Sequence, residues 1–204
     1  CSQEIYYRLL NCGHRIPPSA GSASGVLSNP VGYNRVYVHC EAPLTYGAWW
    51  EGLRQGRVVV TNGPLLRPRV NGQLPGHVFF GETDQEVSLD IALNLSARDK
   101  ISYLEIVKNG RTVQQVRLDE WKSGGGKLPK VKFTESGWML IRAVTDNEET
   151  FRFASTGPYY VDIGGQPRIS KKSAQFFLDW TRQRARQLKL EDTKKQEQAV
   201  YPHQ

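Results

Sequence analysis

The chain has 204 residues, of which 39% are hydrophobic and 23% are charged, as in ordinary globular domains, so a packed core is expected. No run approaches the roughly 18 apolar residues of a membrane-spanning helix, so a soluble chain with no membrane span is expected. The net charge of +7 lies mostly in 171–195, where basic and aromatic residues are not interleaved and no motif of a nucleic-acid-binding module occurs. A solvated helix face is therefore favoured over a nucleic-acid contact.

The helical pattern of residues 4–10 begins almost at the first residue and ends at Gly13, where a positive φ suits glycine. Because the chain begins with Cys1 and is already helical there, we expect it to be the C-terminal part of a larger protein. A lipidated Cys1 is the alternative, although such anchors are usually followed by a flexible polar tether.

Helix and strand signals then alternate up to residue 64. A loop rich in Pro, Gly and Ser over 17–25 precedes a strand over 34–39. A helix capped by Thr45 and closed by Gly56 leads into a strand over 58–60. This order predicts the end of an α/β domain.

Strand patterns bounded by turns replace the helical ones after residue 64. Residues 87–95 alternate between apolar and polar side chains, which predicts a strand with one buried face. The strands 101–108 and 112–118 flank Asn109-Gly110, the pair that best satisfies a type I′ hairpin turn.

Further strands are predicted over 138–144, 151–153 and 159–163, and Ser170 is placed as the cap of a final helix. About seven antiparallel strands at this spacing predict a two-sheet sandwich, and no regular structure is expected in the last polar residues. We therefore predict an α+β chain with four parts: the end of an α/β domain (1–64), an Ig-like antiparallel β-sandwich (65–165), a basic docking helix (166–190) and a polar tail (191–204).

No complete catalytic or metal-binding constellation is visible. The serines of the 21–25 loop lack the G-x-S-x-G turn of an activated nucleophile, and Gly25 is not followed by the Lys-Ser/Thr of a phosphate loop. The four histidines lack the spacing of metal ligands: His14, His39, His77 and His203. We assign no catalytic, cofactor-binding or metal-binding residue.

Several segments resemble the C-terminal end of the CehA/McbA-like PHP-domain metallohydrolases. The resemblance covers most of residues 1–180 and rests on these segments: 6–13 (YYRLLNCG), 20–22 (AGS), 34–38 (NRVYV), 56–64 (GRVVVTNGP), 70–72 (VNG), 75–76 (PG), 104–107 (LEIV) and 109–110 (NG). It implies that residues 1–64 are the end of a PHP-type barrel and that the sandwich is the β-domain carried downstream in that family.

The resemblance also implies a metal site that is degenerate here. The family binds divalent metals through an upstream His-x-His and through a Gly-Ser/Thr-Asp-type loop near the end of the barrel. Ala23 stands where the family has Asp, Gly25 where a His may follow, and neither side chain can coordinate a cation. No cofactor is expected in this chain, and a divalent metal only in the full-length protein. The expected lining of the old pocket consists of Ser22, Ser24, Asn34, Arg35, Thr61 and Asn62, although turn and strand-end roles explain Arg35 and Asn62 equally well.

Two functions are weighed. In the favoured one, the chain is a non-catalytic structural or binding module that contacts the upstream part of the same polypeptide and a protein or carbohydrate partner. The alternative is a segment of an active metal-dependent ester or phosphoester hydrolase whose ligands lie mostly upstream. A binding module predicts an exposed aromatic patch, for which core packing is the competing interpretation of the candidates Trp121, Tyr159 and Tyr160.

Overall fold

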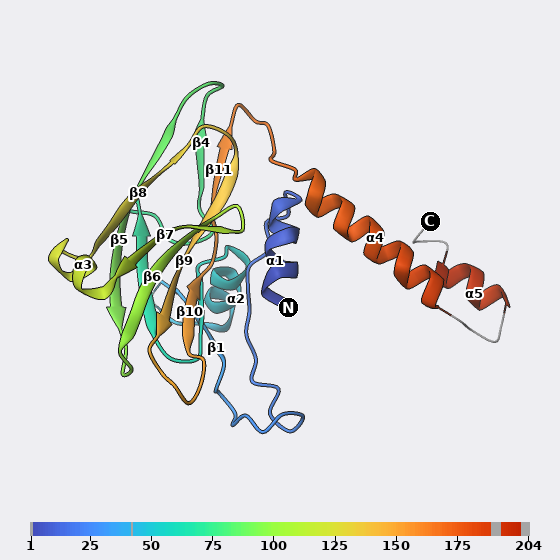
Figure 1. The fold of residues 1–204 in the computed structure, drawn as a ribbon, viewed down its shortest axis with the longest axis horizontal. Coiled ribbons are helices and arrows are strands. Elements are labelled where there is room, and N and C mark those ends of the chain that lie inside the picture. Colours follow the sequence, from blue (N-terminus) through green and yellow to red (C-terminus); the bar gives the residue numbers. More distant parts are fainter. Residues whose placement is uncertain (1, 42, 189–192, 201–204) are drawn as a thin grey trace. The chain divides into compact units, whose positions relative to one another are not determined.

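The computed structural model describes residues 2–41, 43–188 and 193–200, and Figure 1 shows its helices and strands. The chain divides into two compact units. The larger is Arg15–Pro167, and the smaller combines Cys1–His14 with Arg168–Gln204. No described helix has the length and apolar character needed to cross a membrane.

The smaller unit contains the helices α1 (Ser2–Asn11) and α4 (Lys171–Gln187). As predicted, α1 stops before Gly13, which has a φ of +85°, and Ser170 caps α4. The backbone N–H of Ser170 donates to the carbonyl oxygen of Asn11 at 2.8 Å, which ties the start of one helix to the end of the other.

The C-terminal region departs from the prediction of an unstructured tail over 191–204. Residues Thr193–Val200 form a helix, α5, because Lys, Gln, Glu and Ala all have high helix propensity. Residues 191, 192 and 201–204 lie outside the described part of the chain. The docking predicted for the helix over 166–190 is observed in part: Phe176 is half-buried under the Arg8 guanidinium, which lies 4.2 Å from its ring centroid, but Trp180 is 47% exposed.

The larger unit holds an eight-stranded sheet with the order β1-β2-β10-β9-β11-β4, to which β6 and β7 are added on the other side of β9. All its strand pairs are antiparallel except β4 with β11. Its strands are β1 (Arg35–Val38), β2 (Val58–Thr61), β4 (Val78–Gly81), β6 (Ile101–Lys108), β7 (Arg111–Arg117), β9 (Gly137–Thr145), β10 (Phe153–Thr156) and β11 (Tyr159–Ile163).

A second, three-stranded sheet has the order β3-β5-β8, with β3 (Leu65–Val70), β5 (Val87–Ser96) and β8 (Lys127–Phe133). The alternation predicted for β5 is confirmed, since Leu89, Ile91 and Leu93 are buried while their neighbours are exposed. Both edge strands of this sheet contain a proline, Pro68 in β3 and Pro129 in β8.

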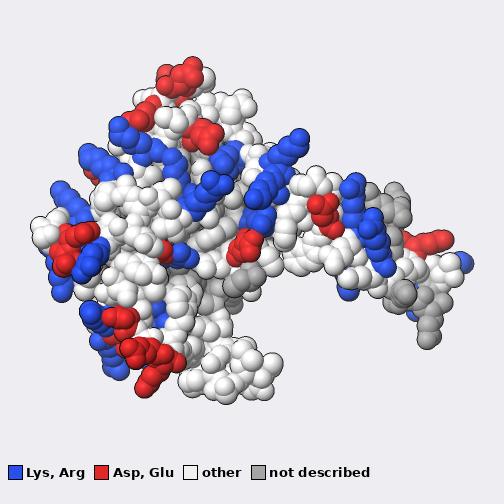
Figure 2. Space-filling view, in the orientation of Figure 1, with Lys and Arg blue, Asp and Glu red and all other residues white. Residues whose placement is uncertain are grey.

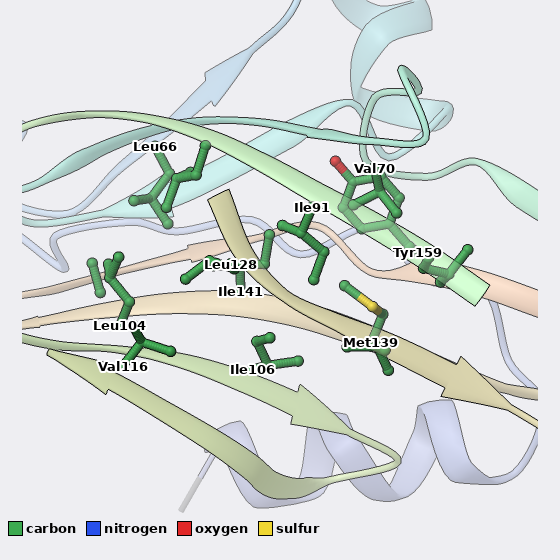
Figure 3. Packing of buried hydrophobic residues seen from close by; sticks show 14 of the residues in the cluster. Leu66, Val70, Ile91, Leu104, Ile106, Val116, Leu128, Met139, Ile141 and Tyr159 are labelled. Carbon is green, nitrogen blue, oxygen red and sulfur yellow. The ribbon is translucent and has the colours of Figure 1, made fainter. Parts of the chain in front are cut away.

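The core of the larger unit lies between the two sheets (Figure 3). Side chains of the small sheet point toward those of the large one. The labelled residues are Leu66, Val70, Ile91 and Leu128 on one side and Leu104, Ile106, Val116, Met139, Ile141 and Tyr159 on the other. The chain therefore contains the predicted two-sheet sandwich in a mixed α+β structure.

The local turn and cap predictions are confirmed as well. Asn109 and Gly110 have φ values of +53° and +84°, as a type I′ turn requires, and join β6 to β7. The N-cap of α2 (Tyr46–Arg54) is Thr45, whose hydroxyl accepts from the N–H of Ala48 at 3.1 Å. A short helix, α3 (Leu118–Ser123), packs Trp121 against the core.

The predicted boundary after residue 64 does not divide the structure into compact units. β2 pairs with β10, with Thr61 opposite Ala154, and β1 pairs with β2, so residues 35–61 extend the large sheet of the sandwich. No barrel is formed by the described residues. The physical reason is that β2 satisfies its backbone hydrogen bonds on a strand about 90 residues further along the chain, which no local signal reveals.

Candidate functional site

Four of the six residues predicted to line a pocket bond the chain's own backbone with their side chains, namely Ser22, Asn34, Thr61 and Asn62. The Ser22 hydroxyl accepts from the Asn34 N–H at 2.9 Å, and the Asn34 side chain donates to the Gly21 carbonyl at 3.2 Å. The remaining serine, Ser24, lies in the turn that follows, where it bridges to Leu27. These contacts are all made within the segment 21–34.

Thr61 at the end of β2 and Asn62 after it also bond the chain's own backbone, and Arg35 is placed on β1 by strand pairing. Arg35 stands opposite Thr61 in the β1–β2 pair, and the Thr61 hydroxyl bonds the carbonyl oxygens of Pro64 and Phe153. The Asn62 side chain accepts from the Phe153 N–H at 2.8 Å and donates to the Phe151 carbonyl at 3.0 Å. Thr61 and Asn62 thus fasten the end of β2 to the strand beside it.

The loop that resembles a degenerate metal loop has a backbone that favours glycine or asparagine. Ala23 has a φ of +50° and Gly25 one of +90°, the left-handed region that L-residues other than Asn and Asp rarely adopt. Within the described ranges, no three His, Cys, Asp or Glu side chains are grouped to hold a metal ion.

The aromatic candidates for an exposed patch are buried, so core packing is the correct interpretation. Tyr159 is fully buried, Tyr160 nearly so, and Trp121 is packed against the core. Burial raises the pKa of both tyrosines, that of Tyr160 to about 12, with a smaller opposing effect from Arg15. Other aromatic residues are exposed, among them Tyr46 and Trp50 on α2, whose rings pack edge to face with centroids 6.0 Å apart.

None of the six predicted residues lines the two adjoining hollows that β1, β2 and β3 form in the larger unit. The first hollow has a volume of about 370 Å³ and lies over β1, β2 and β3, while the second measures about 420 Å³ and continues toward β4. The two share the same five lining residues: His39, Arg57, Arg69, Leu74 and Pro75. Together they form one continuous groove, which we name the arginine cleft.

Three glycines position the basic residues of the arginine cleft. Gly56, Gly76 and Gly157 bring three backbone segments into direct contact, since a Cβ on Gly76 would lie 1.7 Å from the Gln55 oxygen and one on Gly157 would lie 2.5 Å from the Gly56 oxygen. Arg57 follows the first glycine directly, as His77 follows the second. The close approach therefore places a cation and an imidazole on one wall.

A further part of the lining comes from β3. Its alternation buries Leu66, Pro68 and Val70 in the core and leaves Arg67 and Arg69 exposed. The period of two places Arg67 and Arg69 on one face of the strand, and both residues contribute to the lining of the first hollow.

The arginine cleft holds three arginines against a single carboxylate, Glu41. Arg67 donates to the Ser96 hydroxyl at 3.4 Å, and none of the three guanidinium groups forms an ion pair with a described carboxylate. The Nε atom of Arg57 is buried without a hydrogen-bond partner among the described residues. Such a buried donor costs about 1–3 kcal/mol.

Several cations elsewhere on the larger unit form ion pairs with acidic residues. Figure 2 shows Lys and Arg interspersed with Asp and Glu over the visible face of the sandwich. A larger hollow of about 770 Å³ beside α3 contains Lys100 and Arg117, but these pair with Asp146 at 3.4 Å and Asp119 at 3.3 Å. The unpaired arginines set the arginine cleft apart from that hollow.

Sequence reasoning missed this cleft. Arg57 and His77 each directly follow a glycine that ends a helix or turn, and Arg67 and Arg69 alternate with apolar residues, which are the only signals in the sequence that mark them.

Comparison with known proteins gives two distant likenesses among solved structures. One is to the fibronectin(III)-like modules of Clostridium thermocellum CbhA, at 14% identity over 47% of this chain and 96% of that one, with a TM-score of 0.29. The other is to the CARDB domain of the PF1109 protein from Pyrococcus furiosus, in complex with di-metal ions, at 13% identity over 50% and 96%, with a TM-score of 0.25. No family model and no curated protein matches the chain. At these TM-scores neither likeness bears on the function of this chain.

Proposed function

We propose that this chain is a non-catalytic binding module whose arginine cleft holds an anionic ligand. The observation that carries the proposal is the gathering of Arg57, Arg67 and Arg69 in one cleft without an ion-pair partner among the described carboxylates. Arginine presents a planar fork of donors that matches carboxylate and phosphate oxygens. A bound anion would offset the mutual repulsion of these cations.

The proposal narrows the partner expected of the sandwich. The sequence left open whether the sandwich binds a protein or a carbohydrate. The three arginines of the cleft favour a ligand that carries negative charge. The volumes of its two hollows, about 370 and 420 Å³, lie in the usual range of small-molecule sites.

The resemblance to PHP-domain metallohydrolases supports an origin for residues 1–64 at the end of such a domain, with a metal site that has degenerated at Ala23 and Gly25. The alternative function is a segment of an active metal-dependent ester or phosphoester hydrolase. Stoichiometric binding of Zn²⁺, Mn²⁺ or Fe²⁺ by the full-length protein, with metal-dependent hydrolysis of an ester or phosphoester, would favour that alternative.

The binding proposal is tested with inorganic phosphate at low ionic strength. Isothermal titration calorimetry is expected to show saturable binding that weakens by about tenfold or more in Arg57→Gln and in Arg69→Gln, because each loses a charge-assisted hydrogen bond. Arg111→Gln, an exposed arginine outside the cleft, is the matched control and should bind as the unchanged protein does. Equal affinity in all four proteins would refute the site.

A further inference from the structure

The two hollows of the arginine cleft differ in the chemistry of their walls. The first is lined by apolar residues, among them the buried Val58 and Leu66, together with Leu65 and Tyr37, which is 43% exposed. The second is lined mostly by polar groups, among them Gln55, Gln73 and His77. An apolar compartment thus opens directly into a polar one.

Arg57 and Arg69 lie where the two compartments meet, since both line each hollow. They come from different elements: Arg57 from the turn into β2, and Arg69 from the exposed face of β3. An oxyanion held between these two guanidinium groups would have an apolar surface on one side and polar groups on the other.

We propose that the ligand is a small amphiphilic anion, a phosphate or carboxylate group attached directly to an apolar ring. The inference rests on the proposed function and adds the chemical class of the ligand. The anionic group lies between Arg57 and Arg69, and the ring lies in the first hollow against Leu65 and Tyr37. That hollow, at about 370 Å³, accommodates a single substituted ring.

Two simpler ligand classes fit these walls less well. An inorganic anion would use the arginines but leave the apolar walls of the first hollow in water, forgoing the burial of apolar surface that drives most small-molecule binding. A neutral ring would fill the hollow but provide no counter-charge for the three arginines. A ring that carries an anionic group would contact both the apolar residues of the first hollow and the arginines.

The test compares four probes on the whole chain by calorimetry: phenyl phosphate, benzoate, inorganic phosphate and phenol. At least one of the two aromatic anions is expected to bind about tenfold or more tightly than inorganic phosphate, while phenol shows no saturable binding. A preference for phenyl phosphate identifies a phosphate head group, and one for benzoate a carboxylate. Inorganic phosphate as tight as both aromatic anions, or phenol as tight as either, would overturn the inference.

A pair of variants locates the ring. Tyr37→Ser is expected to reduce the advantage of the aromatic anion over inorganic phosphate, and Tyr46→Ser, an exposed tyrosine on α2 outside the cleft, should leave it unchanged. Urea midpoints of both variants confirm that each is folded. An advantage retained in Tyr37→Ser would contradict the placement of the ring.

The outcomes also separate this inference from the proposed function. If inorganic phosphate binds as tightly as both aromatic anions, and Arg57→Gln weakens the binding of all three, the cleft is an anion site without an apolar component. Only this inference then fails. If no anion binds at all, both fail.

Discussion

Replacement of Gly76 by alanine tests the packing that builds the arginine cleft. The added Cβ would lie 1.7 Å from the Gln55 oxygen, far inside ordinary contact, and Gly76 has a φ of +89°. The left-handed backbone costs an L-residue about 1–2 kcal/mol, and forcing the two segments apart costs about 1–3 kcal/mol more. The free energy of unfolding should therefore fall by about 2–5 kcal/mol, which lowers the urea midpoint by about 1–2.5 M if m is about 2 kcal/mol/M.

Gly72→Ala is the matched control for this experiment. Gly72 has a similar φ of +79°, but no atom lies within 4 Å of the position where its Cβ would be. It should lose only the backbone cost, about 1–2 kcal/mol, so the difference between the two variants measures the steric effect alone. Equal urea midpoints for Gly76→Ala and Gly72→Ala would show that the close contact with Gln55 does not hold in solution.

Three further predictions concern the rest of the chain. Ala23→Asn should raise the thermal midpoint by a few degrees, about what 1 kcal/mol gives a chain of this size, because asparagine tolerates the φ of +50°; a lower midpoint in differential scanning fluorimetry would contradict it. Arg142→Met leaves the buried carboxylate of Glu105 without its ion-pair partner and should lower the free energy of unfolding in urea by about 3–5 kcal/mol. If the loss is electrostatic, adding Glu105→Leu to this variant should restore much of that free energy. Since the pKa of Tyr160 is raised to about 12, the unfolded chain ionises first, and stability should fall between pH 10 and 12; an unchanged urea midpoint across that range would refute this.

The features that the sequence predicts well are those whose cause is local. Asn109-Gly110 makes a type I′ turn and Thr45 caps α2 because the φ values and the hydroxyl acceptor are properties of those residues themselves. The alternation in β5 predicts its buried face because the period of two is intrinsic to a strand.

The features that could not be predicted depend on pairing across long stretches of chain. β2 joins β10, and the arginine cleft forms because Gly56, Gly76 and Gly157 allow three distant backbones to touch. The predicted pocket residues such as Asn62 are polar residues beside a turn, and the structure uses their hydrogen bonds for the backbone of β10. A polar side chain near a turn has the same sequence signal whether it bonds a ligand or its own chain.

The two prolines at the margins of the small sheet have a consequence for concentrated solutions of this protein. A strand edge is a template on which a second molecule can stack, but Pro68 and Pro129 each interrupt the row of N–H donors that such stacking needs. Arg67 and Arg69 on the β3 margin would also repel a like-charged copy, whereas Lys130 and Lys132 on the β8 margin are paired with Asp90 and Glu86. Fibrous aggregation is therefore opposed by a proline at both margins and by positive charge at the margin formed by β3.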